Sequence, residues 1–128
     1  MNTFSFNGRR GPIIVSASAS GPADSRELRL VLDTGASVTT LEAKLLEFLG
    51  YDPGASDETV QVVTTDSISE RPVVRLNRLS ALGKHRLGIP VVSQSFPQVA
   101  KIDGVLGLDF LRDGILSIDF RSGQLTLS

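Results

Sequence analysis

The stretch VLDTGAS, residues 31–37, decides how the rest of the chain is interpreted. Two apolar residues typical of a buried strand lead into Asp33, and a small hydroxyl residue and a glycine follow it. Thr34 can hydrogen-bond the backbone, and Gly35 lets the chain turn tightly while it exposes peptide groups near the acid. The stretch therefore predicts a carboxylate held rigidly on a loop at the end of a strand. The simpler interpretation is a turn-forming aspartate between a strand and a helix.

Strand-like segments surround this loop. Residues 12–20 and 26–33 flank GPADS, a run of turn-forming residues, and this combination predicts a β-hairpin. Residues 39–50, TTLEAKLLEFLG, place leucines at helical spacing and end on glycine, which predicts a helix capped by Thr39 or Thr40.

Two further hairpins are expected downstream. Residues 58–82 contain two strand-like runs around the polar stretch 64–69, which predicts a projecting hairpin. Pro72 cannot donate a ladder hydrogen bond, so it favours an edge or projecting strand. A second hairpin is predicted to turn at residues 82–84.

Nearly the same octapeptide occurs twice, at residues 103–110 and 113–120. In the second copy, apolar residues alternate with Ser117 and Asp119, which predicts a half-buried strand that an RSG turn joins to the final strand QLTL. In the first copy, Gly107 interrupts the alternation, and LDFLRD is predicted to continue as a short helix. One apolar pattern is thus predicted to form a strand in the second copy and to lead into a short helix in the first, and Gly107 makes the difference.

The composition argues against several classes of partner and site. The 128 residues suit one compact domain, and 13 basic against 14 acidic side chains, without a dense basic cluster, argue against a nucleic-acid partner. No cysteine and a single histidine, His85, make a metal site improbable, and no cofactor is expected. Asp103, Asp109 and Asp113 resemble a calcium-binding ladder, but their even spacing does not fit that loop pattern.

The chain also contains no apolar run long enough to span a membrane and no signal-peptide core. It is predicted to be cytoplasmic, although a chain trimmed of a leader or membrane anchor would look the same.

A single aspartate is a poor catalyst of peptide hydrolysis, because it cannot act as base and acid towards two reaction partners together. Two carboxylates about 4 Å apart repel by about 4 kcal/mol at an effective dielectric near 20, so such a pair holds one proton over a broad pH range. The chain has one Asp-Thr-Gly sequence. A catalytic partner for Asp33 must therefore come from a second copy of the chain.

With VLDTGAS upstream and GVLGLDFL at residues 104–111 downstream, the chain resembles the retropepsin-like aspartic proteases. The resemblance implies a mostly β fold over a single domain, residues 1–128. That fold is a closed β-barrel lobe with one helix after the DTG loop and a short helix near the C-terminus. It further implies a homodimeric endopeptidase acting on protein or peptide substrates.

The resemblance also assigns roles to individual residues. Asp33 is the expected catalytic carboxylate, Thr34 braces the two loops across the dimer axis, and Gly35 offers a carbonyl to the substrate. Val105 is expected to line a specificity pocket. The expected support of the site consists of Ala36, Leu106 and Gly107, and the expected substrate-covering flap tip consists of Thr64, Thr65, Asp66, Ser67 and Ile68.

The sequence departs from the family pattern at several positions. The predicted flap tip contains no glycine. Ser37 and Leu108 stand where retroviral enzymes carry an ion-paired aspartate and arginine. Ala36 stands where pepsin-like lobes often carry a hydroxyl donor to the carboxylate. Because that donor would favour the ionised form, its loss should raise the pH at which the enzyme works.

Other functions remain open from the sequence. The chief alternative is a non-catalytic module that keeps this fold and binds peptides or dimerises its partners. A third interpretation is a regulatory fragment of a larger membrane protein.

Overall fold

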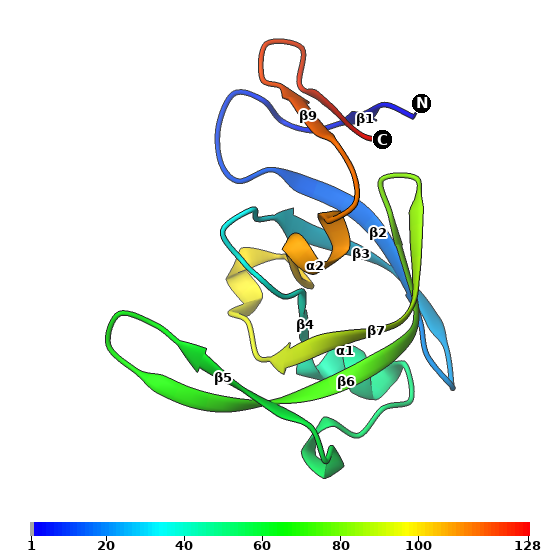
Figure 1. Ribbon diagram of the computed structural model, residues 1–128, viewed down its shortest axis with the longest axis vertical. Helices are drawn as coiled ribbons and strands as arrows, with labels where there is room; N and C mark the ends of the chain where they lie inside the picture. Colours follow the sequence, from blue (N-terminus) through cyan, green and yellow to red (C-terminus); the bar gives the residue numbers. More distant parts are fainter. Residues whose placement is uncertain (1) are drawn as a thin grey trace.

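The computed structural model describes residues 2–128, and strands make up most of it (Figure 1). The strands are β1 (Phe4–Ser5), β2 (Ile14–Ser20), β3 (Ser25–Leu32), β4 (Thr40–Glu42), β5 (Thr59–Val63), β6 (Ile68–Ala81), β7 (Lys84–Gln94), β8 (Gly104–Leu106), β9 (Leu116–Asp119) and β10 (Gln124–Leu127). The helices are α1 (Ala43–Phe48) and α2 (Leu108–Leu111), with short 3-10 helices η1 (Pro53–Ala55) and η2 (Gln98–Ala100). No helix within residues 2–128 is long and apolar enough to cross a membrane.

Six strands close into a barrel. Their order is β2-β3-β8-β4-β7-β6, and β6 pairs back with β2, for example Ala17 with Ala81. Leucines fill the interior, because alternate side chains of each strand point inward. This architecture, together with α1 after the DTG loop and α2 near the C-terminus, confirms the predicted closed β-barrel lobe.

The start of α1 differs from the sequence prediction. Residues 40–42 form strand β4, which pairs with β7 and β8, and the helix begins only at Ala43. The side chain of Glu42, rather than a threonine, caps the helix by accepting a hydrogen bond from the Lys44 amide at 3.4 Å. Tertiary pairing overrides the helical spacing of the leucines here, because the barrel needs β4 to close the gap between β7 and β8.

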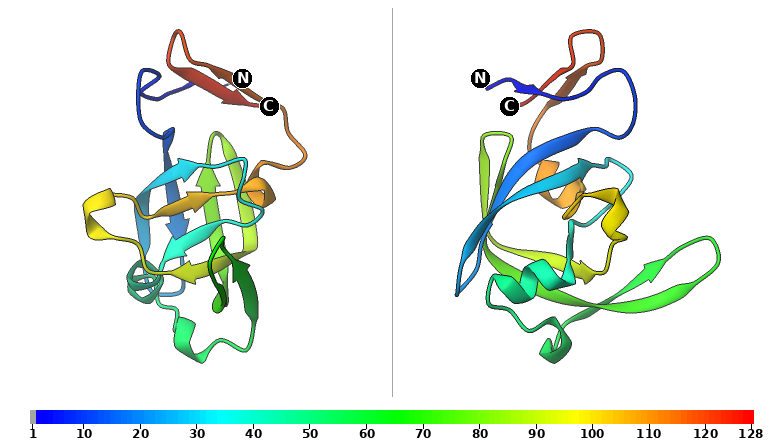
Figure 2. Two further views of the ribbon diagram at one scale, coloured as in Figure 1. Left: turned by 90° about the vertical axis from the view of Figure 1, so that its left-hand side faces the viewer. Right: turned by 180° about the vertical axis from the view of Figure 1, so that it is seen from behind.

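Hairpin β5–β6 projects from the barrel (Figures 1 and 2). The first part of β6 pairs only with β5, whereas its later part forms the barrel wall with β7 and β2. Pro72 lies in the projecting part, opposite Thr59, as predicted. The hairpin at residues 82–84 is also confirmed, with β6 and β7 in antiparallel register.

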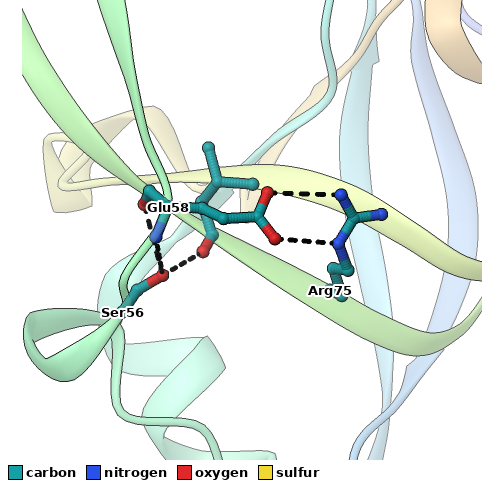
Figure 3. Close-up of polar contacts among 4 residues, drawn as sticks. Ser56, Glu58 and Arg75 are labelled. Atoms are coloured by element: carbon teal, nitrogen blue, oxygen red, sulfur yellow. Dashed lines mark hydrogen bonds and ion pairs between the residues drawn. The ribbon is translucent and has the colours of Figure 1, made fainter.

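A polar cluster joins the base of the projecting hairpin to the segment before it (Figure 3). The Glu58 carboxylate accepts two hydrogen bonds from the Arg75 guanidinium, at 2.9 and 3.2 Å. Ser56 donates its hydroxyl to the Val73 carbonyl and accepts a bond from the Glu58 amide at 3.2 Å. Since both charged side chains are about half exposed, the pair orients this junction more than it stabilises the fold.

A second, three-stranded sheet of order β1-β10-β9 lies beside the barrel, at the end where both termini are found (Figure 2). Phe6 and Phe120 pack edge to face across it, with ring centroids 5.7 Å apart. Asp119 ends β9, and its carboxylate accepts hydrogen bonds from the amides of Arg121 and Ser122 at 2.9 and 3.1 Å. Hydrogen bonding by Ser122, first through its backbone, lowers the pKa of Asp119 below its usual value.

This lowered pKa predicts a pH-dependent loss of stability in Asp119→Ala. A carboxyl whose pKa is lower in the folded state stabilises the fold above its unfolded pKa, and that contribution disappears as the pH falls through the folded pKa. The thermal midpoint of Asp119→Ala should therefore lie below that of the wild type at pH 7, and the difference should shrink towards pH 3. Asp57→Ala, at an exposed carboxylate, is the matched control. An equal difference at both pH values would contradict a role for the ionised carboxylate.

Candidate active site

Asp33 directly follows β3, where a parallel neighbour fixes its backbone. β3 and β8 pair in parallel, with Leu32 opposite Leu106, and the Asp33 amide donates to the Leu106 carbonyl at 3.0 Å. Two segments that are distant in the sequence therefore end side by side. The loop after Asp33 and the glycine after Leu106 meet at this edge.

The Asp33 carboxylate is half-buried, and its Oδ1 accepts a hydrogen bond from the Gly35 amide at 2.8 Å. Within residues 2–128 this is the one hydrogen bond made by the carboxylate, so Oδ2 has no protein partner there. The Ala36 amide donates to the Asp33 carbonyl at 3.2 Å and closes the turn. Ala36 offers the carboxylate no side-chain donor. One oxygen is thus fixed by the backbone, and the other can bind water or a second carboxylate.

Gly107 packs directly against the loop that follows the aspartate. A Cβ at this position would lie 2.7 Å from the backbone of Val38 and 2.8 Å from the Ala36 carbonyl oxygen. The Leu108 amide donates to the same carbonyl at 2.8 Å, and the Asp109 amide donates to Ser37 at 3.2 Å. Only a residue without a side chain allows the start of α2 to approach so closely.

Thr39 and Asp109 add polar contacts that the sequence did not reveal. Thr39 is fully buried, and its hydroxyl and amide both bond to the Asp109 carboxylate, at 2.7 and 3.0 Å. The sequence predicted that Thr39 or Thr40 caps helix α1, and this prediction is wrong because Glu42 is the cap. The sequence assigned no functional role to Asp109. One signal was present: a carboxylate within the otherwise apolar LDFL segment needs a polar partner.

The candidate residues fall into two spatial groups. Asp33, Thr34, Gly35 and Ala36 lie on one loop, with Thr34 and Gly35 exposed. Val105, Leu106 and Gly107 adjoin that loop through β8, where Leu106 is fully buried and Val105 half-buried.

The predicted flap residues form the second group, at the tip of hairpin β5–β6. No hydrogen bond connects them to residues 33–39 within the described chain. Side-chain hydrogen bonds shape this tip, which contains no glycine: the Thr64 hydroxyl lies 2.8 Å from that of Ser67 and donates to Asp66 at 3.1 Å. Ile68 follows the turn with 70% of its surface exposed.

Comparisons with known proteins agree with this geometry. A family model described as aspartyl protease matches residues 15–110, a range that contains both the DTG loop and Gly107. The chain is also similar to the crystal structure of a retropepsin-like aspartic protease from Rickettsia conorii, with a TM-score of 0.74 and 21% identity over 98% of this chain and 88% of that one. At this identity the likeness shows the fold alone. No curated protein sequence matches the chain.

The packing of Gly107 predicts a large cost for Gly107→Ala. The added methyl group would overlap backbone atoms, which cannot move aside as a flexible side chain can. We expect a loss of about 1–3 kcal/mol in the free energy of unfolding, measured by denaturant titration.

Gly54→Ala is the matched control, since its Cβ would meet its nearest neighbour at an ordinary 3.6 Å. It should change stability by less than about 0.5 kcal/mol. Equal effects of the two substitutions would contradict the close approach at Gly107.

Proposed function

The chain belongs to the aspartyl protease family, and on this premise we propose that it is an endopeptidase whose active site is shared by two copies, each contributing Asp33. The observation that carries the proposal is the half-site itself. One carboxylate oxygen is held by the Gly35 amide at 2.8 Å, and the other has no partner within the described chain. The proposal treats residues 1–128 as one domain, which forms half of the enzyme.

Two such carboxylates on an axis can divide the chemistry between them. The ionised one accepts a proton from water as the water oxygen attacks the peptide carbonyl carbon, and the protonated one donates its proton to the carbonyl oxygen. Proton transfer to the amide nitrogen of the resulting tetrahedral diol then allows the C–N bond to break. The products are a carboxylic acid and an amine, and the pair again holds one proton.

The second copy is needed because one chain supplies one DTG loop. Thr34 is exposed beside Asp33, which suits the proposed bracing contact with the partner loop. An association of identical surfaces must be isologous, so each Asp33 faces its own copy across the axis.

The substrate is proposed to bind as an extended peptide between the site floor and the hairpin tip. Backbone hydrogen bonds would supply affinity, and apolar side chains would select sequence. Val105, half-buried beside the loop, is the proposed pocket residue. The proposed covering residues are Thr64, Thr65, Asp66, Ser67 and Ile68.

Asp33→Asn should abolish peptide cleavage while leaving the fold intact. An amide cannot serve as the general base, so we expect the rate to fall by more than about a thousandfold. The measurement is mass spectrometry of a mixed peptide library incubated at mildly acid pH. Asp57→Asn, the same charge change at an exposed site, is the control and should cleave like the wild type. A wild type that cleaves nothing would support the non-catalytic module instead.

Mixing wild type with excess Asp33→Asn tests whether the site is shared. If both copies contribute a carboxylate, a tenfold excess of the inactive chain traps most wild-type chains in mixed dimers. The activity should then fall to about a tenth, as mass action requires for subunits that exchange freely. Dilution of the wild type below its dimer dissociation constant should likewise lower the rate per chain. Unchanged activity in both experiments would show that one chain acts alone.

A further inference from the structure

Thr39 is unusual among the residues that the structure describes, because it is polar and yet fully buried. Within residues 2–128, Ser93 is the one other buried polar or charged residue. A buried hydroxyl group is costly unless it is hydrogen-bonded, so the partners of Thr39 indicate what it does. Those partners are Gly107 and Asp109, at the start of α2 beside the catalytic loop.

The contacts form a chain with a defined direction. The Gly107 amide donates to the Thr39 hydroxyl oxygen at 3.1 Å. An amide can only donate, so the Thr39 hydroxyl accepts this bond and directs its own hydrogen to Asp109 Oδ1 at 2.7 Å. Asp109 Oδ2 accepts the Thr39 amide at 3.0 Å, and Oδ1 also accepts the Phe110 amide at 2.9 Å.

This arrangement requires a carboxylate rather than an amide at position 109. Every group that faces Asp109 in these three bonds is a donor. An asparagine would turn an NH₂ group towards at least one of them, and a buried backbone N–H would lose its acceptor. The contacts are therefore specific to the side chain that is present.

The Thr39–Asp109 pair anchors one end of the loop that carries Asp33. At the other end, the Asp33 amide bonds to Leu106, and between the two ends the Leu108 amide bonds to the Ala36 carbonyl. Thr39 is thus the anchor through which side chains, rather than backbone alone, connect the loop to α2. Beyond it, the Val92 amide bonds to the Thr39 carbonyl at 2.9 Å and joins the anchor to the barrel.

We propose that Thr39 and Asp109 are positioning residues that fix the catalytic loop, and so set the direction of the Asp33 carboxylate. This role rests on the proposed protease function, since it acts on turnover through Asp33. Small displacements of a catalytic group lower the chemical step strongly. Loss of the pair should therefore lower kcat while KM changes little, because the substrate-binding hairpin is a separate element.

The test compares three variants with the wild type on a fluorogenic peptide chosen from those that the wild type cleaves. Thr39→Val keeps the shape but removes the hydroxyl, and Asp109→Asn removes an acceptor. Each should lower kcat by about ten- to a hundredfold with KM within about threefold. Thr39→Ser restores the hydroxyl and should retain most of the wild-type kcat. Ile89→Ala, in the buried barrel wall, controls for general destabilisation.

A second measurement does not depend on catalysis. Amide hydrogen exchange should become faster at residues 34–39 and at Gly107 in Thr39→Val and Asp109→Asn, but not in Ile89→Ala. Strand β2, which pairs with neither β7 nor β8, is the internal reference. If the wild type cleaves no peptide, the proposed function fails and exchange alone decides the positioning role. Unaltered kcat and exchange in both variants, or a loss equal to that of Ile89→Ala at a matched thermal midpoint, would overturn the inference.

Discussion

The parallel pairing of β3 with β8 is the constraint on which the rest of the structure depends. Parallel neighbours need a long crossover connection, and here it contains α1, the projecting hairpin and three of the six barrel strands. The pairing ends both strands at one edge and so places Asp33 beside Gly107. A glycine is required there because the Val38 backbone would lie 2.7 Å from any Cβ.

Strand β6 likewise has two roles, one in the projecting hairpin and one in the barrel. Its first residues form the projecting ribbon with β5, and its later residues pair with β7 and β2 in the barrel. The Glu58–Arg75 pair and the Ser56 contacts lie where one role gives way to the other (Figure 3). The hairpin tip is therefore carried on a strand whose far end is part of the barrel, so the direction in which the hairpin projects is set by barrel geometry.

Much of the fold could be predicted from local pattern, because hairpins and turn residues act over short distances. The DTG loop, the projecting strand with Pro72, and the helix after Gly107 all follow from neighbouring residues. The start of α1 could not be predicted, since TTLE suits either a helix or a strand and barrel closure decides. The anchor at Thr39 was hidden for a related reason: its partner, Asp109, lies 70 residues away in the chain. From the sequence alone, Thr39 resembles a helix cap, and only the folded structure shows that its hydroxyl bonds to Asp109.

The two octapeptides show why a local pattern is not sufficient to define a site. Both carry nearly the same run of apolar residues, yet the first runs from β8 into α2 and the second becomes β9. Gly107 can enter the crowded contact with residues 36–38, whereas Ser117 sits exposed in a sheet at the molecule's end. Asp109 is half-buried and accepts a hydrogen bond from the buried Thr39, but its counterpart Asp119 caps an exposed turn. Equivalent residues thus differ in chemistry because their surroundings differ, and the surroundings of the first copy are open only to a glycine at position 107.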